Sequence, residues 1–155
     1  MRKEHFVANT ALPPARGSYI PVIDPSTDVR LGEIARGTAE DVEAAVAAAR
    51  NAIGECFDGP WGRLTAAQRG RLLYRLSASV AEHGQELAAL EAQDTGKSMK
   101  TARADVTALV RYFEYYAGAC DKLHGETLPY EAGYTVMTVR EPHGVTAHIV
   151  PWNYP

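Results

Sequence analysis

Gly144-Val-Thr-Ala-His-Ile-Val-Pro-Trp-Asn-Tyr-Pro155 is the stretch that decides how this chain folds. Its β-branched run, Val145 to Val150, predicts a strand. The Pro-Trp-Asn-Tyr-Pro sequence that follows predicts a tight turn holding one polar amide, Asn153. In α/β enzymes, strands deliver active-site groups to one edge of a sheet. A strand with no following helix cannot complete a right-handed crossover unit, so we expect the front part of a longer α/β enzyme.

Composition narrows the function classes further. The 155 residues are 46% hydrophobic and carry a net charge of −3 with both signs interspersed. No Lys/Arg-rich block predicts a nucleic-acid surface, and no apolar run is long enough for a membrane span or a secretory leader. The two cysteines, Cys56 and Cys120, match no zinc spacing. A reducing, cytoplasmic location is therefore expected.

The first part of the chain predicts an irregular segment and a hairpin. Residues 1–18 contain Pro13-Pro14 and Gly17 as breakers and are expected to be irregular. Tyr19–Ile23 and Leu31–Ala35 read as two strands joined by a turn rich in Asp and Pro. A two-stranded ribbon is marginal alone, so it is expected to pack on something else.

Helical patterns follow from residue 38 to residue 123. Thr38 and Thr65 are typical N-caps, and Gly54 is a typical helix stop. A third helix is expected over Glu86–Ala92, ending at Asp94-Thr-Gly-Lys97. The clearest helix carries an apolar stripe with alternating spacings of three and four, at Met99, Ala102, Val106, Leu109, Phe113, Tyr116, Cys120 and Leu123. That stripe is expected to be buried against other helices.

The pattern changes to strands after Gly125. Tyr134–Arg140 alternates, Glu141-Pro-His-Gly144 reads as a turn, and Val145–Val150 is the second strand. We therefore expect residues 133–147 to form an antiparallel ribbon that protrudes from the helical layer.

Several landmarks together resemble the N-terminal part of the NAD(P)-dependent aldehyde dehydrogenase superfamily. The match runs from about residue 19 to the end of the chain, and Glu114-Tyr-Tyr-Ala-Gly118 with Trp152-Asn-Tyr-Pro155 is similar to betaine aldehyde dehydrogenases. The landmarks are Thr38–Val42, Pro60-Trp61, Arg69–Leu73, Leu90–Lys97, Tyr115–Gly118, His124–Thr127, Arg140-Glu-Pro142, Gly144-Val145 and Pro151–Pro155.

The resemblance implies an α/β fold built in four parts. Residues 1–18 would be an irregular N-terminus, and 19–123 the N-terminal hairpin with the helical part of the cofactor-binding domain. Residues 124–147 would form a protruding β-ribbon of the kind used for oligomerisation. Residues 148–155 would be the first strand entering the cofactor-binding sheet, truncated here. A homo-oligomer is implied for the complete protein.

The same resemblance assigns roles to the last turn. Asn153 would donate its amide N–H to the oxyanion of the reacting aldehyde, because a neutral amide stabilises negative charge without acting as an acid or base. Val150, Pro151 and Trp152 would line the cofactor cleft together with Asn153, and Tyr154 would contact substrate by cation–π chemistry. The alternatives are an Asn that caps the turn, a Trp that fills core, and a Tyr that only packs.

A structural monovalent cation is also implied by the resemblance. Asp94 would ligate it together with backbone carbonyl oxygens of Val22 and Ile23, since hard cations prefer oxygen ligands. The alternative is that Asp94 caps the helix beginning near Ser98 or orders the Thr95-Gly96 turn. Although Asp94–Lys97 resembles the end of a P-loop, the glycine-rich lead is absent, which excludes that assignment.

The implied reaction is oxidation of a small-molecule aldehyde to a carboxylic acid by NAD⁺ (or NADP⁺) through a cysteine thiohemiacetal. The catalytic thiol and the general base belong to family motifs that lie beyond Pro155, so the chain alone is expected to be inactive. Two alternatives remain open. One is a truncated chain that acts as an assembly or binding module, and the other is a non-functional remnant.

Overall fold

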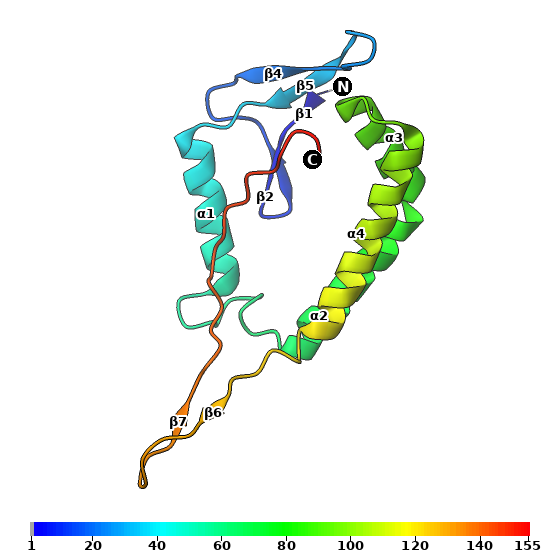
Figure 1. The fold of residues 1–155 in the computed structure, drawn as a ribbon. Coiled ribbons are helices and arrows are strands. Elements are labelled where there is room, and N and C mark those ends of the chain that lie inside the picture. The colour runs from blue at the N-terminus through cyan, green and yellow to red at the C-terminus, as the bar shows by residue number, and fades with distance from the viewer. Residues whose placement is uncertain (1) are drawn as a thin grey trace.

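The computed structural model describes residues 2–155, with only the backbone of Arg2. Within the described residues the helices are α1 (Ala39–Ile53), α2 (Ala66–Glu82), α3 (Gly84–Thr95) and α4 (Met99–Ala119). Helices α2, α3 and α4 lie side by side, and α1 lies apart from them (Figure 1). The strands are β1 (Arg2–Lys3), β2 (His5–Val7), β3 (Thr10–Leu12), β4 (Tyr19–Ile23), β5 (Arg30–Ala35), β6 (Thr127–Leu128) and β7 (Val136–Met137).

The expected irregular N-terminus is wrong for the residues that form β1, β2 and β3. Strand β1 pairs in parallel with β5, and β2 pairs with β3 in a hairpin whose turn residues, Ala8 and Asn9, have φ values of 49° and 61°. Such turns usually carry Asn-Gly or Gly, so Ala8 gave no turn signature. The strands have two or three residues each, too few for a period-2 pattern to show. Met1 lies outside the described residues.

The predicted hairpin of Tyr19–Ile23 and Leu31–Ala35 is confirmed. Strands β4 and β5 pair antiparallel with Ile20 opposite Ile34, and the register shifts between Val22 and Ile23. The sheet order is β1-β5-β4. Because β1 adds a third strand, the ribbon is not left to stand alone, as its marginal stability requires.

The helix boundaries are set by local side-chain contacts, as the sequence predicts. At the start of α1 the backbone N–H and hydroxyl of Thr38 both donate to Asp41 Oδ2, at 2.8 and 2.7 Å. At the start of α2 the Gln68 N–H donates to Thr65 Oγ1 at 3.2 Å, and the Thr65 N–H donates to Gln68 Oε1 at 2.8 Å. This reciprocal pair is a capping box. Gly54, with φ of 80°, ends α1.

The core lies between α2, α3 and α4. Its fully buried residues are Ala88 and Ala102, with Val106 at 8% exposure. Only the first part of the predicted α4 stripe is buried: Tyr116 is 59% exposed, Leu123 is 75% exposed, and the helix ends at Ala119. Small residues fill the buried part, since the helices approach too closely there for larger side chains.

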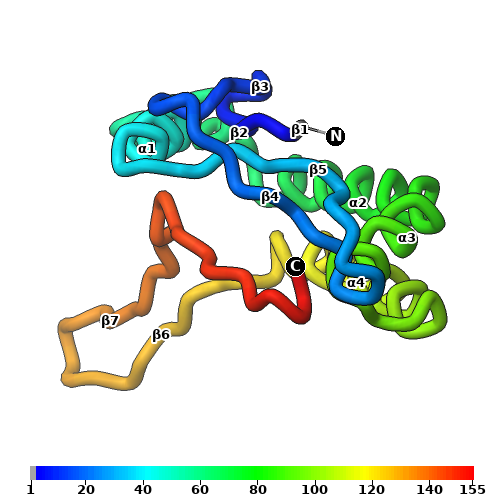
Figure 2. Tube along the Cα trace, turned by 90° about the horizontal axis from the view of Figure 1, so that it is seen from above, coloured from blue at the N-terminus to red at the C-terminus, as the bar shows by residue number. Residues whose placement is uncertain are grey.

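The predicted ribbon protrudes, but with a different pairing. Strand β7 pairs antiparallel with β6, Thr127 opposite Met137, and not with Val145–Val150. The Thr138 N–H also donates to the Glu126 carbonyl at 2.8 Å. The hairpin loop therefore lies before β7, and Glu141–Gly144 is not its turn. Figures 1 and 2 both show this arm extending away from the helices.

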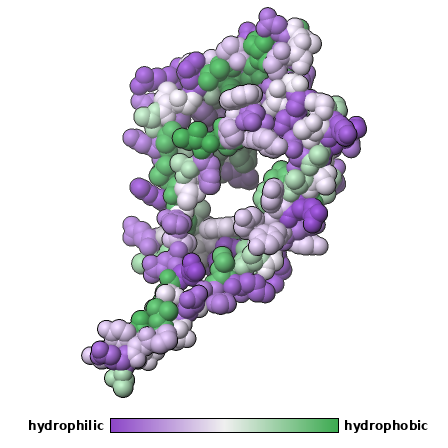
Figure 3. All heavy atoms as spheres, in the orientation of Figure 1, coloured by the Kyte–Doolittle hydropathy of each residue, from purple (hydrophilic) through white to green (hydrophobic). Residues whose placement is uncertain are grey.

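The predicted strand over Val145–Val150 forms no ladder with any described residue. The segment runs upward from the arm (Figure 1), and its end, Pro155, borders the same cavity as Val22 on β4 and Asp94 on α3. Ile149 is fully exposed. A strand needs a neighbour for its backbone hydrogen bonds, and no strand within residues 2–155 pairs with this segment. In Figure 3 the molecule is hollowed at its centre, with apolar side chains along part of the rim.

Candidate active-site turn and the cavities beside it

The turn predicted at the end of the chain is present. The Tyr154 N–H donates to the Pro151 carbonyl at 3.1 Å, which closes a single turn with Asn153 as its third residue. The Asn153 side chain is exposed, and it has no hydrogen-bond partner among the described residues. Within that part of the chain Asn153 therefore does not cap the turn with its side chain. Its amide N–H groups are left available to a ligand.

The residues before Asn153 form one wall of a cleft. Val150 is 58% exposed and Trp152 is 85% exposed, so Trp152 fills no core within residues 2–155. The cleft has a volume of about 490 Å³, and its other wall comes from the end of α3 and the β4–β5 loop. Its lining residues are Pro25, Asp94, Thr95, Val150, Pro151, Trp152 and Pro155. The structure thus places three of the four predicted cofactor residues, Val150, Pro151 and Trp152, in one cleft, and Asn153 is not among the residues that line it.

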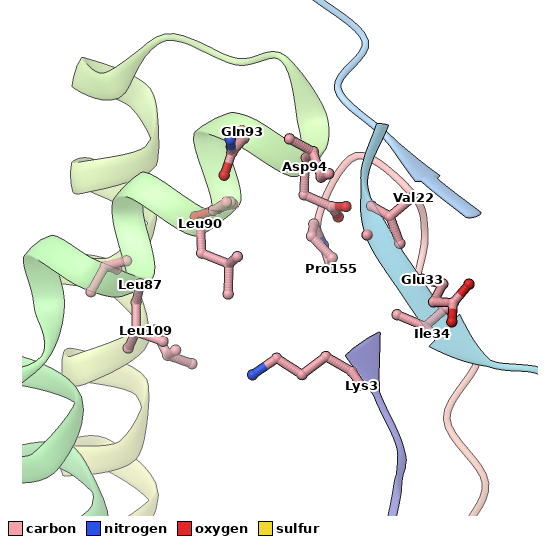
Figure 4. Close-up of a pocket in the computed structure, with 14 residues that line it drawn as sticks. Lys3, Val22, Glu33, Ile34, Leu87, Leu90, Gln93, Asp94, Leu109 and Pro155 are labelled. Atoms are coloured by element: carbon pink, nitrogen blue, oxygen red, sulfur yellow. The ribbon is translucent and has the colours of Figure 1, made fainter. Parts of the chain in front are cut away.

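A second, more apolar cavity of about 550 Å³ lies between the β1-β5-β4 sheet and helices α3 and α4. Figure 4 shows Leu87, Leu90 and Leu109 on the helical side, facing Val22 and Ile34 on the sheet, with Pro155 nearby. Asp94 borders both this cavity and the cleft beside the turn. The end of the chain and the last turn of α3 therefore share a boundary.

The residues predicted to hold a cation are only partly brought together. Asp94, in the last turn of α3, and Val22, on β4, border the same cavity (Figure 4). Ile23 does not line it and is 41% exposed. Of the alternatives for Asp94, capping of α4 is excluded: Ser98 caps α4, its Oγ accepting the Thr101 N–H at 3.2 Å.

Lys97, which was not among the predicted site residues, contacts the turn that carries Asn153. Its ammonium donates to Glu91 Oε1 at 2.5 Å and to Asp105 Oδ2 at 2.9 Å. These two hydrogen bonds, that to Glu91 first, raise the pKa of Lys97 above its usual value. The Nζ atom also lies 4.4 Å from the centroid of the Tyr154 ring. Lys97 follows Asp94 closely in the sequence, but its partners lie on two helices and in a turn distant in the sequence. No local spacing of residues predicts that these side chains meet.

Both cysteines are free thiols away from the turn that carries Asn153. Cys56 is exposed, and the thiol of Cys120, the residue after α4, donates to the Tyr116 carbonyl at 3.2 Å. Among residues 2–155 no group of three His, Cys, Asp or Glu residues is placed to hold a metal ion. In the same residues no helix has the length and apolar character of a membrane span.

Known proteins similar to this chain come from one family. Residues 13–155 match the aldehyde dehydrogenase family. Aldehyde dehydrogenase family 2 member B4 of Arabidopsis thaliana, a mitochondrial protein, is 43% identical over 142 residues, which are 91% of this chain and 26% of that protein.

Solved structures agree with the sequence match. A candidate aldehyde dehydrogenase from Burkholderia cenocepacia is 64% identical with a TM-score of 0.92, over 98% of this chain and 31% of that one. A double mutant of betaine aldehyde dehydrogenase from Staphylococcus aureus, in complex with NAD⁺, is 32% identical with a TM-score of 0.90, over 99% of this chain and 30% of that one.

This chain thus spans about a quarter to a third of the length of these relatives. The structural matches confirm the predicted fold class, an α/β chain that forms the N-terminal part of this fold. With the family match extending over nearly all of its residues, the chain belongs to the aldehyde dehydrogenase family.

Proposed function

We propose that this chain is the N-terminal part of an enzyme that oxidises an aldehyde to a carboxylic acid with NAD⁺. The observation that carries the proposal is the Pro151–Tyr154 turn, which exposes the Asn153 amide beside a cleft walled by Val150 to Trp152. The family membership supplies the reaction class. The thiol nucleophile and the general base would come from residues outside this chain.

Asn153 would act on the carbonyl oxygen of the substrate. When a thiolate adds to an aldehyde, the oxygen gains negative charge, and a fixed N–H donor at hydrogen-bond distance stabilises that charge. The Asn153 side chain can donate without exchanging a proton, so it serves the adduct before and after hydride loss. Among the described residues nothing competes for that amide.

The cleft beside the turn is suitable as part of a cofactor-binding site. Its lining combines the exposed ring of Trp152 and three prolines with the Asp94 carboxylate, which suits an aromatic ring system carrying polar substituents. NAD⁺, when bound, supplies the hydride acceptor. The NAD⁺ complex of the Staphylococcus aureus relative supports NAD⁺, and NADP⁺ is the alternative cofactor.

Three further assignments belong to this proposal. Tyr154 would contact the substrate through the face of its ring that Lys97 does not cover. Asp94 with the backbone of Val22 and Ile23 would hold a structural monovalent cation, for which a carboxylate and carbonyl oxygens are suitable ligands. The protruding β6–β7 arm would pair with another subunit in a homo-oligomer, because its short edges are open.

The location of the protein is proposed from its cysteines. Both are free thiols, as expected in the reducing cytoplasm. The Arabidopsis relative is named as mitochondrial, another reducing compartment. Cell fractionation with an antibody to the arm would decide between the two.

The proposal is tested by expressing the complete protein from its gene and measuring NADH formation at 340 nm with aliphatic, aryl and amino aldehydes. Aldehyde-dependent NADH formation with a stoichiometric carboxylic acid product is the expected result. The 155-residue chain, expressed in parallel, should give none, because Asn153 can stabilise charge only on an adduct that another group forms. A complete protein that oxidises no aldehyde, or an isolated chain that turns over, would contradict the proposal.

A further inference from the structure

Lys97 joins two helices through its ammonium group. Glu91 is on α3 and Asp105 is on α4, and both carboxylates accept hydrogen bonds from Lys97 Nζ, at 2.5 and 2.9 Å. The three side chains are shielded from water, at 14%, 15% and 18% exposure. Charge-assisted hydrogen bonds in such a setting are strong and directional. The position of the ammonium is therefore fixed by two independent partners.

The third neighbour of the ammonium is the ring of Tyr154, which is 49 residues beyond Asp105 in the chain. The 4.4 Å between Nζ and the ring centroid lies well within the roughly 6 Å range of a cation–π contact. An ammonium has three N–H groups, and the two carboxylates take two of them. The remaining side of the cation is free to face the ring. Lys97 thereby connects the helical layer to the turn that carries Asn153.

The backbone around Lys97 is held as firmly as its side chain. The Lys97 N–H donates to Thr95 Oγ1 at 3.3 Å, and the Thr95 hydroxyl donates to the Glu91 carbonyl at 2.7 Å. Gly96 ends α3 with φ of 73°, and a Cβ there would lie 3.0 Å from Pro25 Cγ. The segment is thus wedged against the β4–β5 loop and provides a rigid support.

Asn153 lacks such support of its own. No described residue hydrogen-bonds its side chain, so its orientation depends on the turn to which it belongs. The hydrogen bond that closes this turn is donated by the backbone of Tyr154, the residue next to Asn153. Any movement of the Tyr154 backbone is therefore transmitted to Asn153 through one peptide unit.

We propose that Lys97 is a positioning residue that holds the Tyr154 ring and so fixes the Asn153 amide for oxyanion stabilisation. This inference rests on the proposed function. One face of the Tyr154 ring contacts Lys97, and this contact would hold the turn in place. A cationic substrate group would then have only the opposite face of the ring available.

The test uses the complete protein with substitutions at both ends of the contact. Lys97→Met removes the charge at similar length, and Lys97→Arg keeps a cation over the ring. Tyr154→Leu removes the ring, and Tyr154→Phe keeps it. We expect Lys97→Met and Tyr154→Leu each to lower kcat by about tenfold or more, since a misplacement of about 1 Å can cost up to about a hundredfold. The dissociation constant for NAD⁺ should change by less than about threefold.

Conservative variants and a double mutant separate positioning from general damage. Lys97→Arg should have a kcat close to that of the wild type, well above that of Lys97→Met. Tyr154→Phe should likewise be far more active than Tyr154→Leu. In the double variant Lys97→Met/Tyr154→Leu, the losses should not multiply, because one contact is removed twice. Multiplicative losses, or an unchanged kcat in Lys97→Met, would overturn the proposal.

Lys97→Met leaves two shielded carboxylates without a partner, and this variant could fail to fold for that reason alone. A variant in which all three side chains are neutral removes this difficulty. The triple variant Lys97→Met/Glu91→Gln/Asp105→Asn has no stranded charge, so its thermal midpoint should exceed that of Lys97→Met. Its kcat should nevertheless stay low, because no cation faces the Tyr154 ring. Wild-type kcat in the triple variant would contradict the proposal.

Amide hydrogen exchange gives a readout that does not require turnover. The Tyr154 N–H donates a hydrogen bond to the Pro151 carbonyl, so its exchange rate reports on whether the turn is closed. We expect it to exchange faster in Lys97→Met and at the wild-type rate in Lys97→Arg. If the complete protein oxidises no aldehyde, the proposed function fails while this measurement still tests the contact. Equal exchange in wild type and Lys97→Met would refute the positioning role.

Discussion

A single methyl group added at Gly70 should separate the two helices that pack most closely. Gly70 is buried on α2, and a Cβ there would lie 2.6 Å from the Ala117 carbonyl oxygen of α4. Ordinary contact begins at about 3.4 Å, so the helices would have to move apart by about 0.8 Å. The carbonyl belongs to the α4 backbone and cannot rotate away. The strain must therefore be taken up by the helix pair.

The magnitude follows from opposing terms. Gly→Ala in a helix gains about 1 kcal/mol in intrinsic propensity. Overpacking costs about 1–3 kcal/mol. A shift of about 0.8 Å would also stretch the 3.0 Å bond from Ser77 Oγ to the Val110 carbonyl beyond hydrogen-bond distance, at a further cost of about 1 kcal/mol. We expect Gly70→Ala to be destabilised by about 1–3 kcal/mol net.

Gly118 on α4 is the matched control. A Cβ at Gly118 meets nothing within 4 Å, so Gly118→Ala should be neutral or stabilising by about 0.5–1 kcal/mol. Equilibrium urea unfolding followed by far-ultraviolet circular dichroism measures both variants. The two changes should have opposite signs. A Gly70→Ala variant as stable as Gly118→Ala would refute the close approach of α2 and α4.

Two further predictions concern buried or shared polar contacts. Ser77→Ala removes the α2–α4 hydrogen bond to the Val110 carbonyl and should cost about 1 kcal/mol in urea unfolding, whereas Ser79→Ala, an exposed neighbour on α2, should cost much less. Asp41 has a lowered pKa, caused first by the Ala15 N–H and then by Thr38. Its contribution to stability is complete above the usual carboxyl pKa of 3.8 and is lost as the pH falls through the lower folded value. Asp41→Asn should therefore be less stable than wild type at pH 6, with a smaller difference at pH 3; an equal difference at both would contradict the account.

Much of the fold could be predicted because its determinants are local. Thr38 and Thr65 cap their helices with residues three positions away, and a period of 3.6 residues marks each helix independently of its surroundings. The hairpin of β4 and β5 follows from two short strands with a turn between them. These elements need no knowledge of distant neighbours.

The errors involve strands that depend on their partners, some far away in the sequence and some only a few residues away. Strand β1 exists because β5 lies beside it, and β7 pairs with β6 because the chain folds back before Val136. Val145–Val150 has strand propensity, but no neighbouring strand within the described residues, so no ladder forms. β-propensity reflects fit to a sheet surface more than an intrinsic backbone preference.

In the candidate site, too, some features could be predicted from the local sequence and others depend on distant contacts. The turn around Asn153 was predictable from two prolines and an amide in five residues. The Lys97 contacts were not, because Glu91, Asp105 and Tyr154 come together only through the packing of α3, α4 and the last segment. The resemblance to a family identified the residues to which roles were assigned. The proposed positioning role of Lys97 could be inferred only from the structure.

The central claim is that the exposed amide of Asn153 stabilises the oxyanion formed from an aldehyde. Its most direct test is steady-state kinetics of Asn153→Ala in the complete protein, with NAD⁺ binding titrated separately and Asn51→Ala, an exposed asparagine on α1, as the control. The account predicts that Asn153→Ala lowers kcat about a hundredfold or more, with the dissociation constant for NAD⁺ nearly unchanged and Asn51→Ala like wild type. Turnover of Asn153→Ala equal to that of the wild type would contradict it.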